Sequence, residues 1–141
     1  MTVETRKKKK TKTVLIVDDD AEYLNFLCIA IGTEYPVVSV TSGEEAIRVA
    51  RAKKPDVIVM DVIMPGGRDG FSTFCELRND SRTSDIPVII LSSVNKVTGL
   101  QFETGNMKQQ LGHAPAAFLE KPVPSEKLLA EIRKALGDGP A

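Results

Sequence analysis

The sequence predicts an α/β fold, a doubly wound five-stranded parallel sheet with helices on both faces. Short apolar runs alternate along the chain with segments of helical periodicity, which is typical of βα units. Two of the apolar runs, Val14–Val17 and Val57–Met60, are each followed by aspartate. The chain has 141 residues, enough for one domain with a buried core.

The first twelve residues differ in composition from the rest. Residues 1–12 are polar and basic and lack periodicity, which predicts a disordered arm before a domain at 13–137 and a short tail at 138–141. Lysine plus arginine and aspartate plus glutamate both number 19, so the chain is acidic outside this arm. No aromatic residue lies among the lysines to stack on bases, so we do not expect nucleic acid as a partner.

Five strands are predicted, at about 13–17, 36–40, 56–60, 87–92 and 115–119. Each is a run of four to six mostly apolar residues, far shorter than a membrane span requires. The start of the chain has no signal-peptide pattern either. We therefore expect a cytoplasmic protein that does not associate with membranes.

The helix after the first strand has an apolar stripe at i, i+3, i+4 and i+7, formed by Leu24, Leu27, Cys28 and Ile31. Asp20 is its predicted N-cap, and Gly32 is its predicted glycine terminus. Cys28 and Cys75 show no metal-binding or disulfide spacing, so both are predicted to be buried, reduced thiols.

Three further helices are indicated. One starts with a capping box at Ser42–Glu45, one begins near Asp69 and Gly70, and the last runs from Ser125 to Gly137. Residues 93–114 predict a short helix whose limits the glycine spacing leaves open.

Chemically active residues follow four of the strands. Asp18 and Asp19 follow the first strand, Asp61 ends the third, Ser92 ends the fourth and Lys121 comes shortly after the fifth. The carboxyl ends of such strands form the ligand-binding edge of a doubly wound sheet. Clustered carboxylates repel unless a cation holds them, so a metal site with a candidate nucleophile is predicted, suited to phosphoryl transfer.

Over roughly residues 13–137 the sequence resembles the receiver domain of two-component response regulators. The resemblance rests on four motifs: Val17-Asp18-Asp19-Asp20, Met60-Asp61-Val62-Ile63-Met64-Pro65 with Asp69-Gly70, Ile90-Leu91-Ser92-Ser93, and Phe118-Leu119-Glu120-Lys121-Pro122. It implies a flavodoxin-like receiver fold with strand order 2-1-3-4-5.

The resemblance also implies the chemistry. Asp61 would accept a phosphoryl group from a sensor histidine kinase or a phosphotransfer protein. Asp19, Asp61 and the backbone carbonyl of Ile63 would ligate Mg²⁺ directly, with Asp18 acting through water. The protein would be a signalling phosphoacceptor rather than an enzyme, with at most weak self-catalysed phosphorylation and dephosphorylation.

Phosphorylation would be transmitted by Ser92 and Phe118. Ser92 would move toward the phosphoryl group and hydrogen-bond one of its oxygens, Lys121 would pair with another, and Phe118 would turn inward. The expected output is contact with a downstream protein or a phosphorelay step by a monomer or weak dimer. Because no output domain follows Gly137, we expect a single-domain regulator or a fragment of a longer one.

Two segments depart from the family's pattern. The loop at Gly66–Asp69 has one residue more than usual, and residues 93–114 are longer than the family's typical span. Partner choice is therefore not inherited from the family. Two alternatives remain open: a degenerate receiver that binds partners without phosphorylation, and a haloacid-dehalogenase-like phosphatase with Asp18 as nucleophile.

Overall fold

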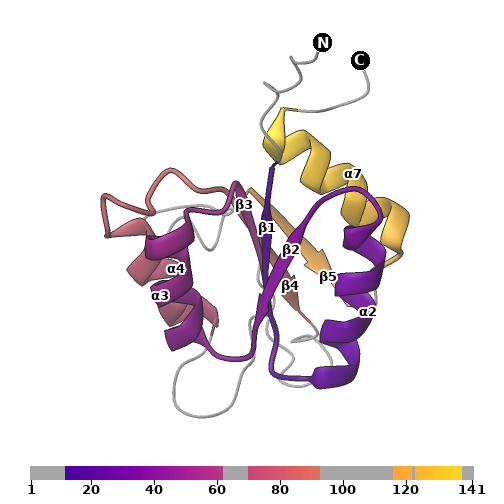
Figure 1. The fold of residues 1–141 in the computed structure, drawn as a ribbon, viewed down its shortest axis with the longest axis horizontal. Coiled ribbons are helices and arrows are strands. Elements are labelled where there is room, and N and C mark those ends of the chain that lie inside the picture. The colour runs from indigo at the N-terminus through magenta and orange to yellow at the C-terminus, as the bar shows by residue number, and fades with distance from the viewer. Residues whose placement is uncertain (1–11, 62–69, 93–115, 122, 138–141) are drawn as a thin grey trace.

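Five parallel strands form one sheet in the order β2-β1-β3-β4-β5 (Figure 1). The computed structural model describes residues 12–61, 70–92, 116–121 and 123–137. The strands are β1 (Val14–Val17), β2 (Val37–Val40), β3 (Val57–Asp61), β4 (Val88–Ser92) and β5 (Ala117–Glu120). The predicted parallel sheet and its strand order are both confirmed.

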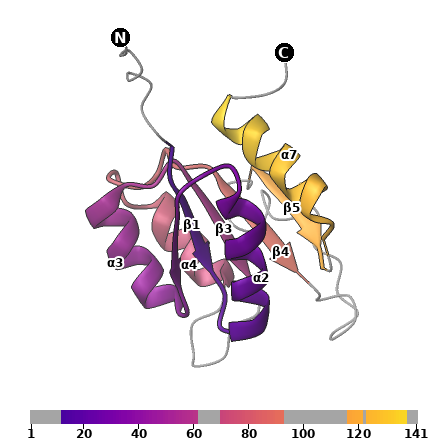
Figure 2. The same cartoon turned by 45° about the vertical axis from the view of Figure 1, so that its right-hand side comes forward.

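Four described helices cover the two faces of this sheet. They are α2 (Ala21–Gly32), α3 (Gly43–Lys53), α4 (Gly70–Arg78) and α7 (Ser125–Leu136). Helices α3 and α4 lie on one face, and α2 and α7 lie on the other (Figures 1 and 2). The doubly wound arrangement is therefore also confirmed.

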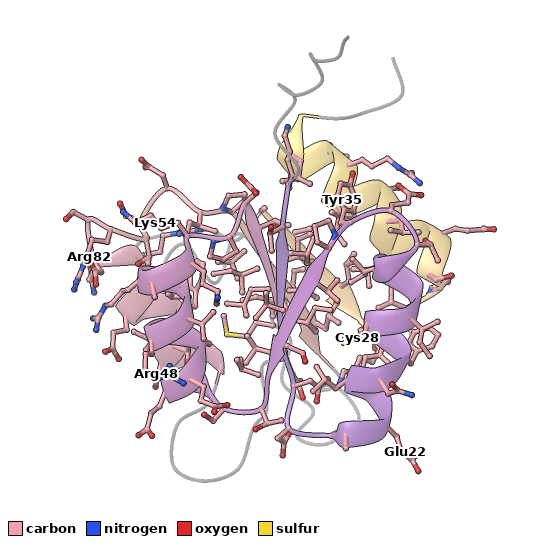
Figure 3. The ribbon with its side chains drawn as sticks, viewed as in Figure 1. Glu22, Cys28, Tyr35, Arg48, Lys54 and Arg82 are labelled. Atoms are coloured by element: carbon pink, nitrogen blue, oxygen red, sulfur yellow. The ribbon has the colours of Figure 1, made fainter. Side chains whose placement is uncertain are left out.

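Each face of the sheet has its own apolar core, because side chains alternate between faces along each strand. The α3/α4 core is built around Leu15, Ile58, Met60, Phe74 and Ile90, and the α2/α7 core around Ile16, Leu27, Val59, Leu91 and Leu128. Figure 3 shows side chains filling both spaces, while Arg48 and Arg82 point to solvent. The central strands β1, β3 and β4 are buried on both faces, which fixes their register firmly.

The start of α2 is capped as predicted, and the helix ends at Gly32 as predicted. Asp20 Oδ1 accepts the backbone N–H groups of Glu22 at 3.0 Å and Tyr23 at 3.4 Å. Gly32 is the last residue of the helix, but it is not left-handed, and Thr33 is the C-cap. The carbonyl of Ile31 instead accepts the N–H groups of the two residues before Pro36, and the chain turns there.

The other helix ends follow recognised capping chemistry. Ser42 Oγ accepts the N–H of Glu45 at 3.2 Å, and the Glu45 carboxylate returns to the N–H of Thr41 at 3.3 Å, one residue earlier than in a standard capping box. Helix α7 ends at Gly137 with φ of 75°, as predicted. Lys54 caps α3 with φ of 51°, a left-handed conformation that is costly for a residue with a side chain.

The two ends of the described chain meet at the edge of the sheet remote from the aspartates. Lys12 Nζ donates to the carbonyl of Leu136, at the end of α7, at 2.9 Å. An ammonium group stabilises the negative end of a helix. Lys12, which the sequence placed in the disordered arm, therefore has a defined contact with the domain.

Several predictions fall outside the described residues. These concern residues 1–11, the loop at 66–69, the helix within 93–114 and the tail at 138–141. Cys28 and Cys75 are both thiols, as predicted, but they are half-buried rather than buried. In the described part of the chain, no helix has the length and apolar character needed to cross a membrane.

Candidate metal centre

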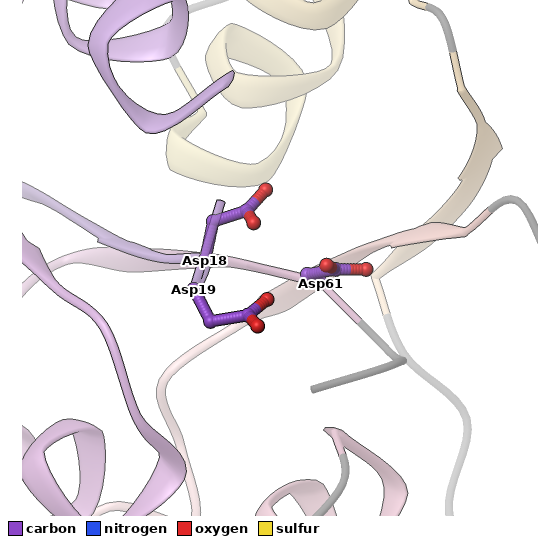
Figure 4. A group of neighbouring side chains, drawn as sticks. All are labelled: Asp18, Asp19 and Asp61. Atoms are coloured by element: carbon purple, nitrogen blue, oxygen red, sulfur yellow. The ribbon is translucent and has the colours of Figure 1, made fainter. Parts of the chain in front are cut away.

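Three carboxylates converge where β1 and β3 end. The strands pair in parallel with Val17 opposite Met60, so the residues that follow, Asp18 and Asp61, leave the sheet side by side. Asp19 extends from the next position. One carboxylate oxygen from each aspartate lies within 4.8 Å of the others (Figure 4). The sheet register therefore produces the cluster that the sequence predicts.

The three aspartates differ in their exposure to water. Asp18 is fully buried, Asp61 is 6 % exposed, and Asp19 is exposed. Asp18 Oδ1 accepts the backbone N–H of Asp20 at 2.9 Å, which satisfies one of its oxygens and fixes the carboxylate at the start of α2. Buried carboxylates this close together need a compensating positive charge.

Lys121 supplies part of that charge. It follows β5, and its Nζ lies 3.3 Å from Asp18 Oδ2 and 3.3 Å from Asp61 Oδ2. Burial of the ammonium by itself would lower its pKa, but the two carboxylates outweigh this effect, and the pKa of Lys121 is raised above its usual value. Lys121 is therefore charged at neutral pH.

Tyr23 is a component of the site that the sequence did not indicate. Its ring lies under the Lys121 ammonium, with Nζ 4.4 Å from the ring centroid. Tyr23 lies four residues before Leu27 and therefore on the apolar stripe of α2, so the sequence could have predicted that Tyr23 faces the core. No local pattern pairs this position with a lysine about a hundred residues later.

The remaining predicted site residues are placed only in part. Ser92 ends β4 in register with Glu120, so its backbone lies on the strand next to Lys121. Ile63 lies outside the described residues. Phe118 is half-buried and packs against the α3/α4 core, on the face of the sheet opposite α7. The switching role predicted for Ser92 and Phe118 stays a prediction.

The donor set fits a hard divalent cation. The three clustered carboxylates and the one ammonium group leave a formal charge of two minus at the site. Carboxylate oxygens are the ligands that Mg²⁺ and Ca²⁺ prefer, and Mg²⁺ binds through few carboxylates with its other positions left for water or phosphate. Asp18, Asp19 and Asp61 would hold such an ion.

Known proteins match both the sequence and the fold. The family model described as "Response regulator receiver domain" matches residues 14–133. Protein PilH of Pseudomonas aeruginosa is 34 % identical over 124 residues, covering 87 % of this chain and 96 % of PilH. The response regulator PleD of Caulobacter vibrioides is 32 % identical over 121 residues, 85 % of this chain but 25 % of PleD. The chain also spans about half of several other relatives, such as 47 % of a probable transcriptional regulator, ycf27, of Guillardia theta.

Solved structures show the same architecture. The chemotaxis response regulator CheY4 of Vibrio cholerae has a TM-score of 0.74 at 25 % identity, covering 90 % of this chain and all of CheY4 (100 %). The signal receiver domain of a modulated diguanylate cyclase from Desulfovibrio desulfuricans has a TM-score of 0.72 at 28 % identity, covering 91 % and 95 %. Receiver domains are signalling modules that generally bind Mg²⁺ at an acidic pocket and interact with histidine kinases or phosphotransfer proteins and downstream effectors. This chain belongs to the response regulator receiver domain family of two-component signalling.

Proposed function

We propose that this chain accepts a phosphoryl group on Asp61 from the phosphohistidine of a sensor histidine kinase or phosphotransfer protein, in a Mg²⁺-dependent reaction. The observation that carries the proposal is the ammonium of Lys121, held 3.3 Å from both Asp18 and Asp61 beside a third carboxylate. A nucleophilic carboxylate, acidic metal ligands and a fixed cation are the parts that phosphoryl transfer requires.

Asp61 is the best nucleophile among the three aspartates. Asp18 is fully buried, and its two oxygens are engaged by the Asp20 N–H and by Lys121. Asp19 is exposed and so keeps its hydration. Asp61 combines slight exposure with direct contact to the ammonium group. The burial of Asp18 also argues against a phosphatase that uses it as nucleophile.

The transfer is a substitution at phosphorus. One Asp61 oxygen forms a bond to phosphorus as the P–N bond to the histidine breaks, and the imidazole nitrogen leaves with that electron pair and takes up a proton. The product is an acyl phosphate. Lys121, already beside Asp61, would pair with a phosphoryl oxygen and offset its negative charge. A Mg²⁺ ion held by Asp18, Asp19 and Asp61 would offset further negative charge during the transfer.

Other residues complete the proposal. The Ile63 backbone carbonyl would be a further metal ligand, and the Ser92 hydroxyl would donate to a phosphoryl oxygen. Phe118 would report the phosphorylated state to a downstream protein by changing its packing. Its half-buried position against the α3/α4 core is compatible with two packing arrangements.

Phosphorylation with acetyl phosphate and Mg²⁺ tests this function. Intact-mass analysis should show one added phosphoryl group on the wild type, none on Asp61→Asn, and one on the control Asp20→Asn, whose site is the nearby helix cap. A label that survives Asp61→Asn but is lost in Asp18→Asn would favour the phosphatase. If neither acetyl phosphate nor a kinase labels the wild type, that result would favour the alternative of a receiver that binds partners without phosphorylation.

A further inference from the structure

Tyr23 lies between the acidic site and the outer surface of α2. Its backbone N–H donates to the Asp20 cap, so the first turn of the helix fixes its position. Its ring is stacked at a tilt on that of Phe26, with centroids 5.6 Å apart and an interplanar angle of 33°. The Lys121 ammonium lies on this ring, 4.4 Å from its centroid. Helix α2 thus presents a supported aromatic face to the lysine.

Lys121 has two kinds of contact. Its ion pairs are with Asp18 and Asp61, two of the three carboxylates that would hold a divalent cation. A bound cation would compete for these oxygens and repel the ammonium. The aromatic face of Tyr23 is the other described contact of Lys121, and it includes no metal ligand. A cation bound to the carboxylates would therefore not compete for this contact.

A lysine needs such a contact more than an arginine would. Its ammonium is a compact, strongly hydrated charge on a flexible stem of four carbons. Without a fixed partner it gains entropy and hydration by leaving the site. The quadrupole of an aromatic ring holds a cation over its face and adds no negative charge.

The ring of Tyr23, and not its hydroxyl, makes the contact with Lys121. In the part of the chain that the structure describes, the Tyr23 hydroxyl is a buried polar atom with no hydrogen-bond partner. Burying a hydroxyl without a partner costs stability. A phenylalanine at this position would keep the face under Lys121 and remove that cost.

We propose that Tyr23 is a positioning residue whose ring holds the Lys121 ammonium beside Asp61 when a divalent cation occupies the carboxylates. The proposal rests on the proposed function, since the held ammonium is the one that would meet the incoming phosphoryl group. Loss of the ring releases the ammonium to solvent and slows phosphorylation, without removing any metal ligand.

The test compares Tyr23→Leu with Tyr23→Phe and with Phe26→Leu, which removes the neighbouring ring that does not contact Lys121. Acetyl phosphate is the donor, so that a lost contact with a protein partner cannot imitate the effect. At saturating Mg²⁺, Tyr23→Leu should be phosphorylated about threefold to tenfold more slowly, given the usual strength of a cation–π contact. Tyr23→Phe should restore the rate to within about twofold of wild type. Equal rates for wild type and Tyr23→Leu would overturn the proposal.

A second measurement does not depend on phosphorylation or on the stability of a variant. Proton–carbon spectra of wild-type protein should show the Lys121 Hε resonances shifted upfield by the Tyr23 ring current, both without and with Mg²⁺. If the upfield shift is absent, or disappears when Mg²⁺ is added, the ring does not hold the ammonium. A wild type that shows the shift but is never phosphorylated would refute the proposed function and leave the contact itself established.

Discussion

Replacing Lys121 by methionine should destabilise the metal-free protein and increase its response to Mg²⁺. The substitution keeps an unbranched side chain and removes the charge that lies 3.3 Å from both Asp18 and Asp61. The formal charge of the cluster then falls from two minus to three minus. Three carboxylates within 4.8 Å would remain with no ammonium group beside them.

The size of the effect follows from distance and burial. At 3.3 Å and an effective dielectric constant of about 20, each Lys121 contact is worth roughly 5 kcal/mol before desolvation is subtracted. Removing one partner of a buried ion pair costs about 3–5 kcal/mol. Because Asp19 is exposed and the Lys121 side chain is 16 % exposed, water screens part of the effect. We expect a loss of about 3 kcal/mol in the free energy of unfolding.

Urea unfolding followed by circular dichroism, with EDTA or with Mg²⁺, measures this change. An ion at 100 times its dissociation constant stabilises a protein by about 2.7 kcal/mol. Since the variant site is more negative, Mg²⁺ should bind it more tightly than it binds the wild type. Binding that is roughly thirtyfold tighter adds about 2 kcal/mol to the variant and reduces its deficit to about 1 kcal/mol. Lys127→Met, which removes an exposed lysine from α7, should change stability by less than about 0.5 kcal/mol. An equal deficit for Lys121→Met with and without Mg²⁺ would refute this electrostatic account.

Three further predictions concern the fold. Phe74→Ala empties a fully buried position in the α3/α4 core and should cost about 3–5 kcal/mol in urea unfolding, with Phe74→Leu costing clearly less. Lys54→Gly relieves a left-handed residue and should raise the free energy of unfolding by about 1 kcal/mol; no gain would show that the φ of 51° is not strained. Hydrogen bonds from Arg82 and Arg51 hold the pKa of Asp80 well below its usual range, so its contribution to stability is complete above a pH of about 4 and is lost progressively below it. The destabilisation caused by Asp80→Asn should therefore shrink as acid is added, and a deficit that does not change with pH would contradict this.

Most of the fold could be predicted because its signals are local. Strand positions follow from apolar runs bounded by polar residues and proline, and their observed ends lie within two residues of the predicted ones. The Asp20 and Ser42 caps follow from side chains that bond to amides two or three residues away. The end of α2 at Gly32 was also predicted, although Gly32 is not left-handed, because glycine permits that conformation without requiring it. There the backbone bonds to the carbonyl of Ile31 determine the turn.

Only those site residues that lie at the ends of strands could be predicted from the sequence. Asp18, Asp61 and Lys121 meet because parallel pairing places the ends of β1, β3, β4 and β5 at one edge. The position of the Tyr23 ring under the Lys121 ammonium depends instead on how α2 is rotated against the sheet. The apolar stripe of α2 indicates which side of the helix faces the sheet, but it does not indicate that Tyr23 meets Lys121 there.

The rigidity of the sheet explains why this site depends on cations. The carboxylates of Asp18 and Asp61 cannot separate to relieve their repulsion, because the register of β1 against β3 is fixed by apolar cores on both faces. Burial prevents water from screening the repulsion. A positive charge is then needed to offset the repulsion. The ammonium of Lys121 provides it to both carboxylates, and it is covalently part of the chain. A divalent ion or a phosphoryl group bound at this site would each change the strength of the ion pairs between the ammonium and the carboxylates. The position of Lys121 among Asp18, Asp61 and Tyr23 is therefore the feature of this site most sensitive to what binds there.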